Sequence, residues 1–148
     1  KKDGLVASNS SSMGPGMLGA YFAEGGGNTA NFLNLHFFSP AENPVMQLVE
    51  IIRGADTTPE AVSTAHAFVR SINKTPVLLN DGSAGFLVNA GLAAYMIEAE
   101  KLYREGTSVE DIDAAMRASI FPMGPFELGD AAGLDTASGM FDTIHAAT

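Results

Sequence analysis

The first half of the chain alternates short apolar runs with polar or glycine-rich connections, a pattern typical of an α/β domain. Each apolar run is short enough to be a strand, and the two middle runs are rich in aromatic or β-branched residues. These runs cover residues 5–7, 32–38, 45–52 and 76–79. We expect the first run to be a buried strand, since Gly4 and a serine cluster bound it. Between the first two runs, residues 13–31 predict a weak helix over 17–22 followed by a glycine-rich connector.

One amphipathic helix is expected between the third and fourth strands. Thr57 and Glu60 have the spacing of a capping box, and Pro59 suits the first helical turn. An apolar stripe at helical spacing follows, formed by Val62, Ala65, Val69 and Ile72. The predicted order is therefore three strands, a helix and a strand, which is the tail of an α/β domain.

From Gly85 onward the pattern predicts only helices, so we place a domain boundary near residue 82. Residues 86–97 carry no charge, which predicts a helix buried on most sides by its own domain or by a partner subunit. Gly106 is expected to end this helix, and Thr107 with Glu110 to cap the next. Gly124 and the proline after it open a further helix, with Glu127 in its first turn.

Composition narrows the classes of function. The chain has 148 residues, of which 46% are hydrophobic, and this is enough to build a core. Its net charge of −9 argues against nucleic acid and anionic membrane surfaces as partners, but not against a small anionic ligand. The absence of cysteine excludes a thiolate metal site, and no run of 18 apolar residues predicts a membrane span.

His36 is the strongest candidate for chemistry among the three histidines. It lies where an apolar run meets a turn, and ligand sites of open α/β sheets gather at the carboxyl ends of strands. From these residues alone, a core or turn histidine is still the favoured interpretation of His36. His66 suits the surface of the amphipathic helix, and we expect His145 to be uninvolved. No second histidine stands at ligand spacing from His36, so we expect no metal site.

Glu50 interrupts an otherwise nearly apolar strand, where an unpaired carboxylate is costly. Its partner could be Arg53 or solvent on an exposed face. The alternative partner is the imidazole of His36, because a carboxylate that accepts from one ring nitrogen fixes the tautomer and stabilises the imidazolium. That pair would form a general base. We therefore predict that the side chains of His36 and Glu50 lie within hydrogen-bond reach.

Six segments, in one order over nearly the whole chain, resemble those of L-3-hydroxyacyl-CoA dehydrogenases. A-S-N-S-S-S at 7–12 is similar to the family's A-S-N-T-S-S, and L-H-F-F-S-P at 35–40 is similar to its L-H-F-F-N-P. P-V-M-Q-L-V-E at 44–50 is similar to P-V-M-K-L-V-E, and G-F-L-V-N at 85–89 is similar to G-F-I-V-N. The segments at 110–116 and 122–128, followed by G-L-D at 133–135, continue the match. The resemblance implies a partial Rossmann-type domain over residues 1–82 and an all-α C-terminal dimerisation domain over residues 83–148.

The resemblance also implies roles for individual residues. His36 would be the catalytic base that removes the proton of the 3-hydroxyl, and Glu50 would hold it. Ser11 would lie beside both nicotinamide and substrate, and Asn89 would contact the acyl-CoA. Ser39 stands where the family's Asn helps to place the nicotinamide. The implied reaction is NAD-dependent oxidation of a 3-hydroxyacyl-CoA in fatty-acid β-oxidation, by a homodimer in the cytoplasm, or in the mitochondrial matrix or peroxisome of a eukaryote.

Some features depart from the family pattern. Serine at 39 is shorter than the usual asparagine, and Ala90 replaces the usual arginine. The connection between His36 and Pro44 is two residues longer than usual, and the family's G-x-G-x-x-G loop does not occur. We therefore expect at most half of a cofactor site here, in a piece of a longer enzyme that is inactive by itself.

Two alternatives follow from these departures. The chain could be a non-catalytic dimerisation module derived from the family, a hypothesis that the changes at Ser39 and Ala90 favour. The joint presence of His36, Glu50, Ser11 and Asn89 argues against it, since a scaffold needs none of them. The other alternative is a related two-domain dehydrogenase of another β-hydroxyacid, such as a sugar acid.

Overall fold

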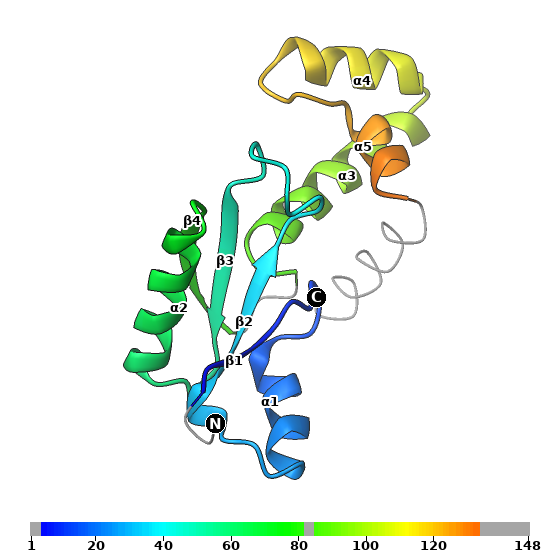
Figure 1. Ribbon diagram of the computed structural model, residues 1–148. Helices are drawn as coiled ribbons and strands as arrows, with labels where there is room; N and C mark the ends of the chain where they lie inside the picture. The colour runs from blue at the N-terminus through cyan, green and yellow to red at the C-terminus, as the bar shows by residue number, and fades with distance from the viewer. Residues whose placement is uncertain (1–3, 82–84, 134–148) are drawn as a thin grey trace. The chain divides into compact units, whose positions relative to one another are not determined.

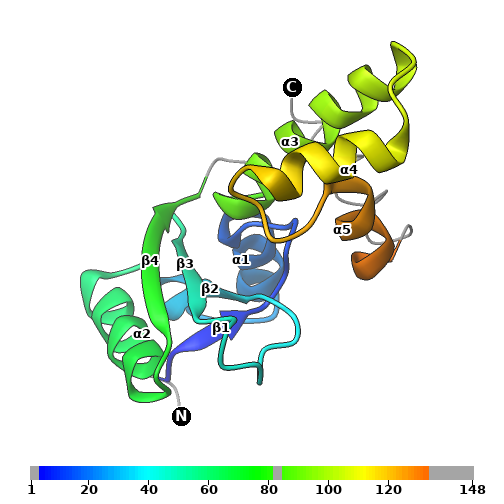
Figure 2. The ribbon, with the colours of Figure 1, turned by 90° about the horizontal axis from the view of Figure 1, so that it is seen from above.

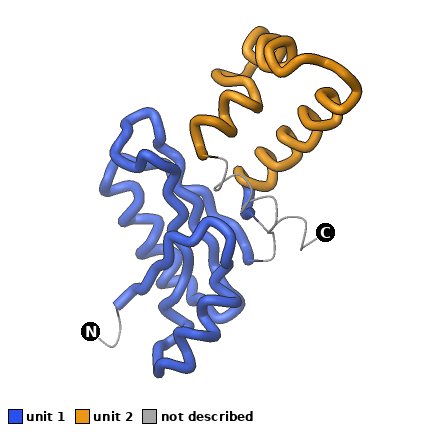
Figure 3. Tube along the Cα trace, turned by 90° about the vertical axis from the view of Figure 1, so that its right-hand side faces the viewer, with its two compact units in different colours: residues 1–87 blue, residues 88–148 orange. Residues whose placement is uncertain are grey.

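The structure, a computed structural model, describes residues 4–81 and 85–133. The chain divides into two compact units, Lys1–Leu87 and Val88–Thr148 (Figure 3). The first unit carries all the strands of the described residues, and the second unit is helical there. Among the described residues, no helix has both the length and the apolar character needed to cross a membrane.

A four-stranded mixed sheet is the framework of the first unit (Figure 1). Its strands lie side by side in chain order, as β1 (Val6–Ser8), β2 (Phe32–Phe37), β3 (Leu48–Arg53) and β4 (Thr75–Asn80). The pairs β1–β2 and β3–β4 are parallel, whereas β2 and β3 are antiparallel. The antiparallel pair has a consequence for function, because its register places His36 directly opposite Glu50.

Two helices cover opposite faces of this sheet, as Figures 1 and 2 show together. On one face lies α2 (Pro59–Ser71), over a core of buried apolar side chains: Leu33, Leu35, Val49, Ile51, Ala65 and Val69. On the other face lies α1 (Pro15–Glu24), whose Phe22 ring stacks on Phe32 with centroids 5.1 Å apart. Burial of each larger apolar side chain contributes about 1.5–3 kcal/mol, so the α2 face stabilises the sheet.

The period-two alternation of β2 and β3 divides their residues between these faces. The apolar odd-numbered residues of both strands form the core beneath α2, whereas Arg53 at the end of β3 is exposed. The even-numbered positions are therefore on the α1 face, and they include three buried polar residues, Asn34, His36 and Glu50. The apolar packing of one face thus determines that these polar side chains gather on the other.

The cap of α2 lies one residue later than the sequence predicted. Thr58 is the N-cap, and its hydroxyl accepts from the amide of Ala61. The side chain of Thr57 is instead buried, where it donates to the carbonyl of Phe32 at 2.7 Å and accepts from the amide of Gly54. Because these bonds tie the start of β2 to the β3–α2 connection, Thr57 is not available to cap the helix.

Two expectations about strands are also wrong. The first strand is not buried within this chain: Val6 is 39% exposed, because β1 pairs on one side only with a described strand. The third strand begins at Leu48 rather than at residue 45, and Val45 is 80% exposed. A local turn explains this, since the side-chain oxygen of Asn43 accepts from the amide of Val45 and its carbonyl accepts from Met46.

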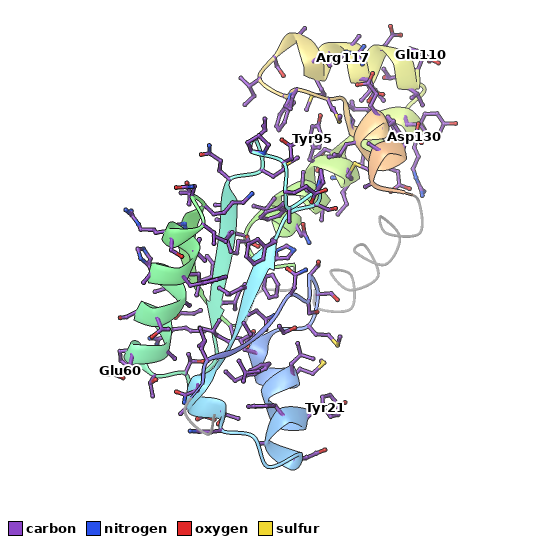
Figure 4. The ribbon with its side chains drawn as sticks, viewed as in Figure 1. Tyr21, Glu60, Tyr95, Glu110, Arg117 and Asp130 are labelled. Atoms are coloured by element: carbon purple, nitrogen blue, oxygen red, sulfur yellow. The ribbon has the colours of Figure 1, made fainter. Side chains whose placement is uncertain are left out.

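The second unit contains three described helices, α3 (Val88–Arg104), α4 (Val109–Ala118) and α5 (Pro125–Ala132). Ser108, not Thr107, caps α4 by accepting from the amide of Asp111. Asp113 of α4 is buried, and its carboxylate accepts from the first amides of α5, those of Phe126 and Glu127. Figure 4 labels Tyr95, Glu110, Arg117 and Asp130 on these helices.

The uncharged stretch before residue 97 is less buried than predicted. The helix starts at Val88, after Phe86, whose φ is +56°. From Val88 to Ile97, Ala93 alone is buried among the described residues. The described residues of the second unit therefore leave most of this stretch half-buried. The other predicted cover, a partner subunit, is taken up below.

Candidate active site

A buried imidazole–carboxylate pair joins the two antiparallel strands. The Nδ1 atom of His36 lies 2.6 Å from Oε2 of Glu50, so the two side chains are within hydrogen-bond reach, as the sequence predicted. Their exposed fractions are 3% and 0%. The sheet itself sets this contact, because residues opposite each other on neighbouring strands project their side chains to the same face.

This contact determines how His36 is protonated. A carboxylate only accepts hydrogen bonds, so Nδ1 of the imidazole carries a hydrogen and donates it to Glu50. In neutral His36 the other nitrogen, Nε2, then has a free lone pair. The hydroxyl of Ser11 lies 3.1 Å from Nε2 and donates to it. Nε2 is thus the basic nitrogen of the pair, and the residue next to it, Ser11, is exposed.

Aromatic rings and a tight turn enclose the pair. The ring of Phe38 lies 4.7 Å from that of His36, and the ring of Phe86 lies 5.5 Å away, edge to face. The amide of Leu87 donates to Oε1 of Glu50 at 3.0 Å. Positive φ is rare for a bulky residue such as Phe86 and costs roughly 1–3 kcal/mol. The turn therefore holds a strained backbone that brings one ring and one amide onto the pair.

A short loop after β1 carries Ser11 and is bonded to β2 at two points. The side-chain oxygen of Asn9 accepts from the amide of Phe37 at 2.9 Å. The side-chain amide of Asn34 donates to the carbonyl of Met13 at 2.9 Å and, at 3.5 Å, to that of Ser10. Both contacts tie the loop to the strand that also carries His36. The loop and the histidine therefore share one support.

A second loop, between β2 and β3, is held by the residue that directly precedes β4, the strand next to β3. Its anchor is Lys74, whose ammonium donates to the carbonyls of Ala41 and Met46, each at 2.6 Å. A longer contact of 3.4 Å reaches the carbonyl of Asn43. This loop contains the two extra residues noted in the sequence, and the three carbonyls give it a defined shape around one cation.

The remaining predicted site residues lie in different places. Ser39 is exposed at the beginning of the Lys74-held loop, and its hydroxyl makes no hydrogen bond to a described residue. Asn89 lies half-buried in the first turn of α3, in the second unit. His66 is exposed on α2, as expected for a surface histidine. His145 lies outside the described residues.

Sequence reasoning missed Asn34, Asn9 and Lys74. The signal for Asn34 was present, because it is a polar residue within an apolar strand, the same feature that identified Glu50. Asn9 and Lys74 gave no comparable signal. Their partners are backbone groups 28–33 residues away in the chain, and no side-chain pattern records such contacts.

Comparison with known proteins relates both units to one family. Residues 1–82 match the family described as 3-hydroxyacyl-CoA dehydrogenase, NAD binding domain. Residues 85–148 match the family described as 3-hydroxyacyl-CoA dehydrogenase, C-terminal domain. Together these matches cover nearly the whole chain, and they meet close to the boundary between the two compact units.

Individual relatives agree with the family matches. The fatty acid oxidation complex subunit alpha of Shewanella oneidensis is 44% identical over 134 residues, which are 90% of this chain and 18% of that protein. A 3-hydroxybutyryl-CoA dehydrogenase structure from Escherichia coli has 34% identity and a TM-score of 0.87, covering 99% of this chain and 30% of that one. The structure of (S)-3-hydroxybutyryl-CoA dehydrogenase from Ralstonia eutropha has 33% identity and a TM-score of 0.86, and the match covers 96% of this chain and 48% of that one. The chain thus spans about a fifth of the curated relatives and a third to a half of these structures.

Proposed function

Since the chain belongs to the 3-hydroxyacyl-CoA dehydrogenase family, we propose that it is the catalytic-base part of an enzyme that oxidises L-3-hydroxyacyl-CoA to 3-oxoacyl-CoA with NAD. In this proposal residues 1–82 are the end of the NAD-binding domain, and residues 83–148 are the helical C-terminal domain. The observation that carries the proposal is the buried contact between His36 and Glu50, with Ser11 on the other ring nitrogen.

The chemistry assigned to the chain is removal of a proton from the 3-hydroxyl. The substrate hydroxyl takes the place of the Ser11 hydroxyl as the donor to Nε2 of His36, the ring nitrogen that is not bonded to Glu50. As the proton transfers, His36 becomes an imidazolium, and the Glu50 carboxylate beside it stabilises that charge in a buried setting. In this proposal the Ser11 hydroxyl, which lies 3.1 Å from Nε2, donates a hydrogen bond to the carbonyl that forms.

The fit of NAD to these residues is partial. Exposed hydroxyls at Ser11 and Ser39 lie just beyond the carboxyl ends of β1 and β2, the edge where ligands of such sheets bind. These two side chains would contact the nicotinamide end. When bound there, NAD accepts the hydride from C3 of the substrate. The residues for the pyrophosphate are not among those of this sequence, since it has no G-x-G-x-x-G segment.

Asn89 is proposed to contact the acyl-CoA, and the helical unit is proposed to form a homodimer. Support for the dimer comes from α3, whose stretch from Val88 to Ile97 has no charge and is largely half-buried. The cited relatives are bacterial, so we assign the reaction to the cytoplasm. Sedimentation of the purified protein at several concentrations tests the dimer, and a monomer at all concentrations would contradict it.

The rival function is a non-catalytic dimerisation module that keeps these residues without using them. It predicts that His36 can be replaced without consequence. The related β-hydroxyacid dehydrogenase makes a different prediction, namely activity with a free hydroxyacid instead of its CoA thioester. The contacts among His36, Glu50 and Ser11 favour a catalytic protein over the module.

One experiment separates these functions. NADH formation by the full-length protein is followed with L-3-hydroxyacyl-CoA thioesters and with free sugar acids, for wild type and for His36→Ala. We expect turnover of the thioester and a loss of about 10²–10⁴-fold on substitution, the usual contribution of a positioned general base. His66→Ala, on the exposed face of α2, is the matched control and should retain full activity. Equal turnover by wild type and His36→Ala would overturn the proposal.

A further inference from the structure

A buried asparagine supports the loop that carries Ser11. Asn34 lies in the middle of β2, fully buried, two residues before His36 and on the same face of the sheet. Its Nδ2 donates to the carbonyls of Met13 and Ser10, at 2.9 and 3.5 Å. These two carbonyls lie on either side of Ser11 in the chain.

The position of Ser11 depends on such contacts because the loop has no regular structure of its own. Ser11 is exposed, yet its hydroxyl lies 3.1 Å from Nε2 of the buried His36. Asn9 fixes the beginning of the loop to the amide of Phe37, and Asn34 fixes its middle. The strand that presents the imidazole therefore also sets where the hydroxyl lies.

The other end of the Asn34 side chain shows that this residue is not there for stability alone. Its Oδ1 is buried and has no hydrogen-bond partner among the described residues. A buried acceptor without a partner destabilises the fold, and an apolar side chain of similar shape would avoid that cost. What the asparagine provides is its donor, and both acceptors of that donor belong to the Ser11 loop.

We propose that Asn34 is a positioning residue of the active site: it holds the loop of residues 9–14 so that the Ser11 hydroxyl meets His36. The catalytic importance of this contact rests on the proposed function, whereas the placement of the loop does not. Asn34 acts only through Ser11. Its replacement therefore lowers kcat while Ser11 is present and has no further effect once Ser11 has been removed.

The first test measures the loop directly, without activity. Hydrogen exchange of the backbone amides of residues 9–14 is compared in the full-length wild type and in Asn34→Leu, which keeps the branched shape and removes the donor. Exchange in this segment should be about 10-fold faster in the variant, with β3 unchanged. Unchanged exchange over residues 9–14 would overturn the proposal. Asn34→Ala serves as a second variant if the leucine disturbs folding.

The second test is a double-mutant cycle in kcat with Ser11→Ala and Asn34→Leu. A misplaced reacting group costs up to about 10²-fold, so Asn34→Leu should lower kcat by about 10–100-fold in the wild type and less than twofold in Ser11→Ala. Equal effects in both backgrounds would mean a general structural role and would refute the assignment.

Thr57→Val is the matched control, because it removes a buried hydrogen bond to the start of β2, away from the loop. It should change neither the exchange of residues 9–14 nor the coupling with Ser11. If the wild-type protein oxidises no 3-hydroxyacyl-CoA, the proposed function fails, yet the exchange measurement still decides whether Asn34 holds the loop. If activity is present and the exchange and coupling are absent, only the role of Asn34 fails.

Discussion

Replacement of Glu50 by glutamine examines the reasoning about the active site most directly. The change keeps the size and shape of the side chain and removes one charge. In the wild type each carboxylate oxygen faces a donor. Oε2 accepts from Nδ1–H of His36, and Oε1 accepts from the amide of Leu87. Glutamine has one oxygen and one NH₂ group, so it can accept in only one of these two directions.

The energies of the two arrangements determine the outcome. If the glutamine oxygen faces His36, its NH₂ group opposes the amide of Leu87, so two donors face each other beside a buried side chain, at a cost of roughly 1–3 kcal/mol. If the oxygen faces Leu87, the NH₂ group donates to Nδ1 of His36, and the contacts with His36 and with the amide of Leu87 both survive. The second arrangement is the more stable, and it moves the proton of the neutral imidazole to Nε2.

A proton on Nε2 removes the lone pair that would accept the substrate proton. We therefore expect Glu50→Gln to lower kcat by about 10²–10⁴-fold, the range of a lost general base, with the lost counter-charge acting in the same direction. The substrate KM should change much less, because the pair acts on the reacting hydroxyl and not on the CoA moiety. The reaction is followed by NADH absorbance.

Nitrogen NMR of His36 provides the readout independent of rate, since the two ring nitrogens exchange their protonated and unprotonated signals when the tautomer changes. The matched control is Glu60→Gln, an exposed carboxylate at the start of α2 (Figure 4), which should leave rate and spectrum unchanged. A kcat within twofold of wild type for Glu50→Gln, or an unchanged tautomer, would refute the reasoning.

Three further predictions concern the supports of the fold. Lys74→Met should lower the free energy of unfolding by about 1–2 kcal/mol, measured by urea denaturation, because backbone carbonyls lose a charged donor; Lys74→Arg should lose less. Asp113→Ala should cost about 2 kcal/mol in the same assay, since the first amides of α5 lose their acceptor; a change below 0.5 kcal/mol, roughly the surface-substitution range, would contradict this. The pKa of Glu127 is lowered from 4.5 by the amide of Gly124 and then by Arg117, so its NMR titration midpoint should lie below that value. Its stabilising effect is present above the unfolded-state pKa and is lost as the pH falls through the lower folded-state pKa; Glu127→Gln should remove this acid dependence.

Local patterns in the sequence were sufficient to predict most elements of secondary structure. Strand-length apolar runs predicted β2 and β4 to within one residue at either end, and the helical stripe with Pro59 predicted α2. The caps were each displaced by one residue, to Thr58 and Ser108. Adjacent threonine and serine residues are chemically equivalent as caps, so the choice depends on tertiary contacts such as the one that occupies Thr57.

The sequence by itself pointed to the residue types of the candidate site, because a carboxylate in an apolar strand is costly without a partner and a histidine at a strand end is one possible partner. It also predicted that His36 and Glu50 approach each other. Their catalytic role, and those of Ser11, Ser39 and Asn89, remain proposals.

Only the tertiary structure decided the register and the supports. The register of β2 against β3 places His36 opposite Glu50. Because the apolar side chains of both strands pack under α2, the buried polar side chains lie on the opposite face of the sheet. The bonds from Asn34 and Lys74 run to backbone carbonyls of distant loops. Every residue has a carbonyl, so a sequence carries no mark of which ones will be bonded; the fold alone selects them.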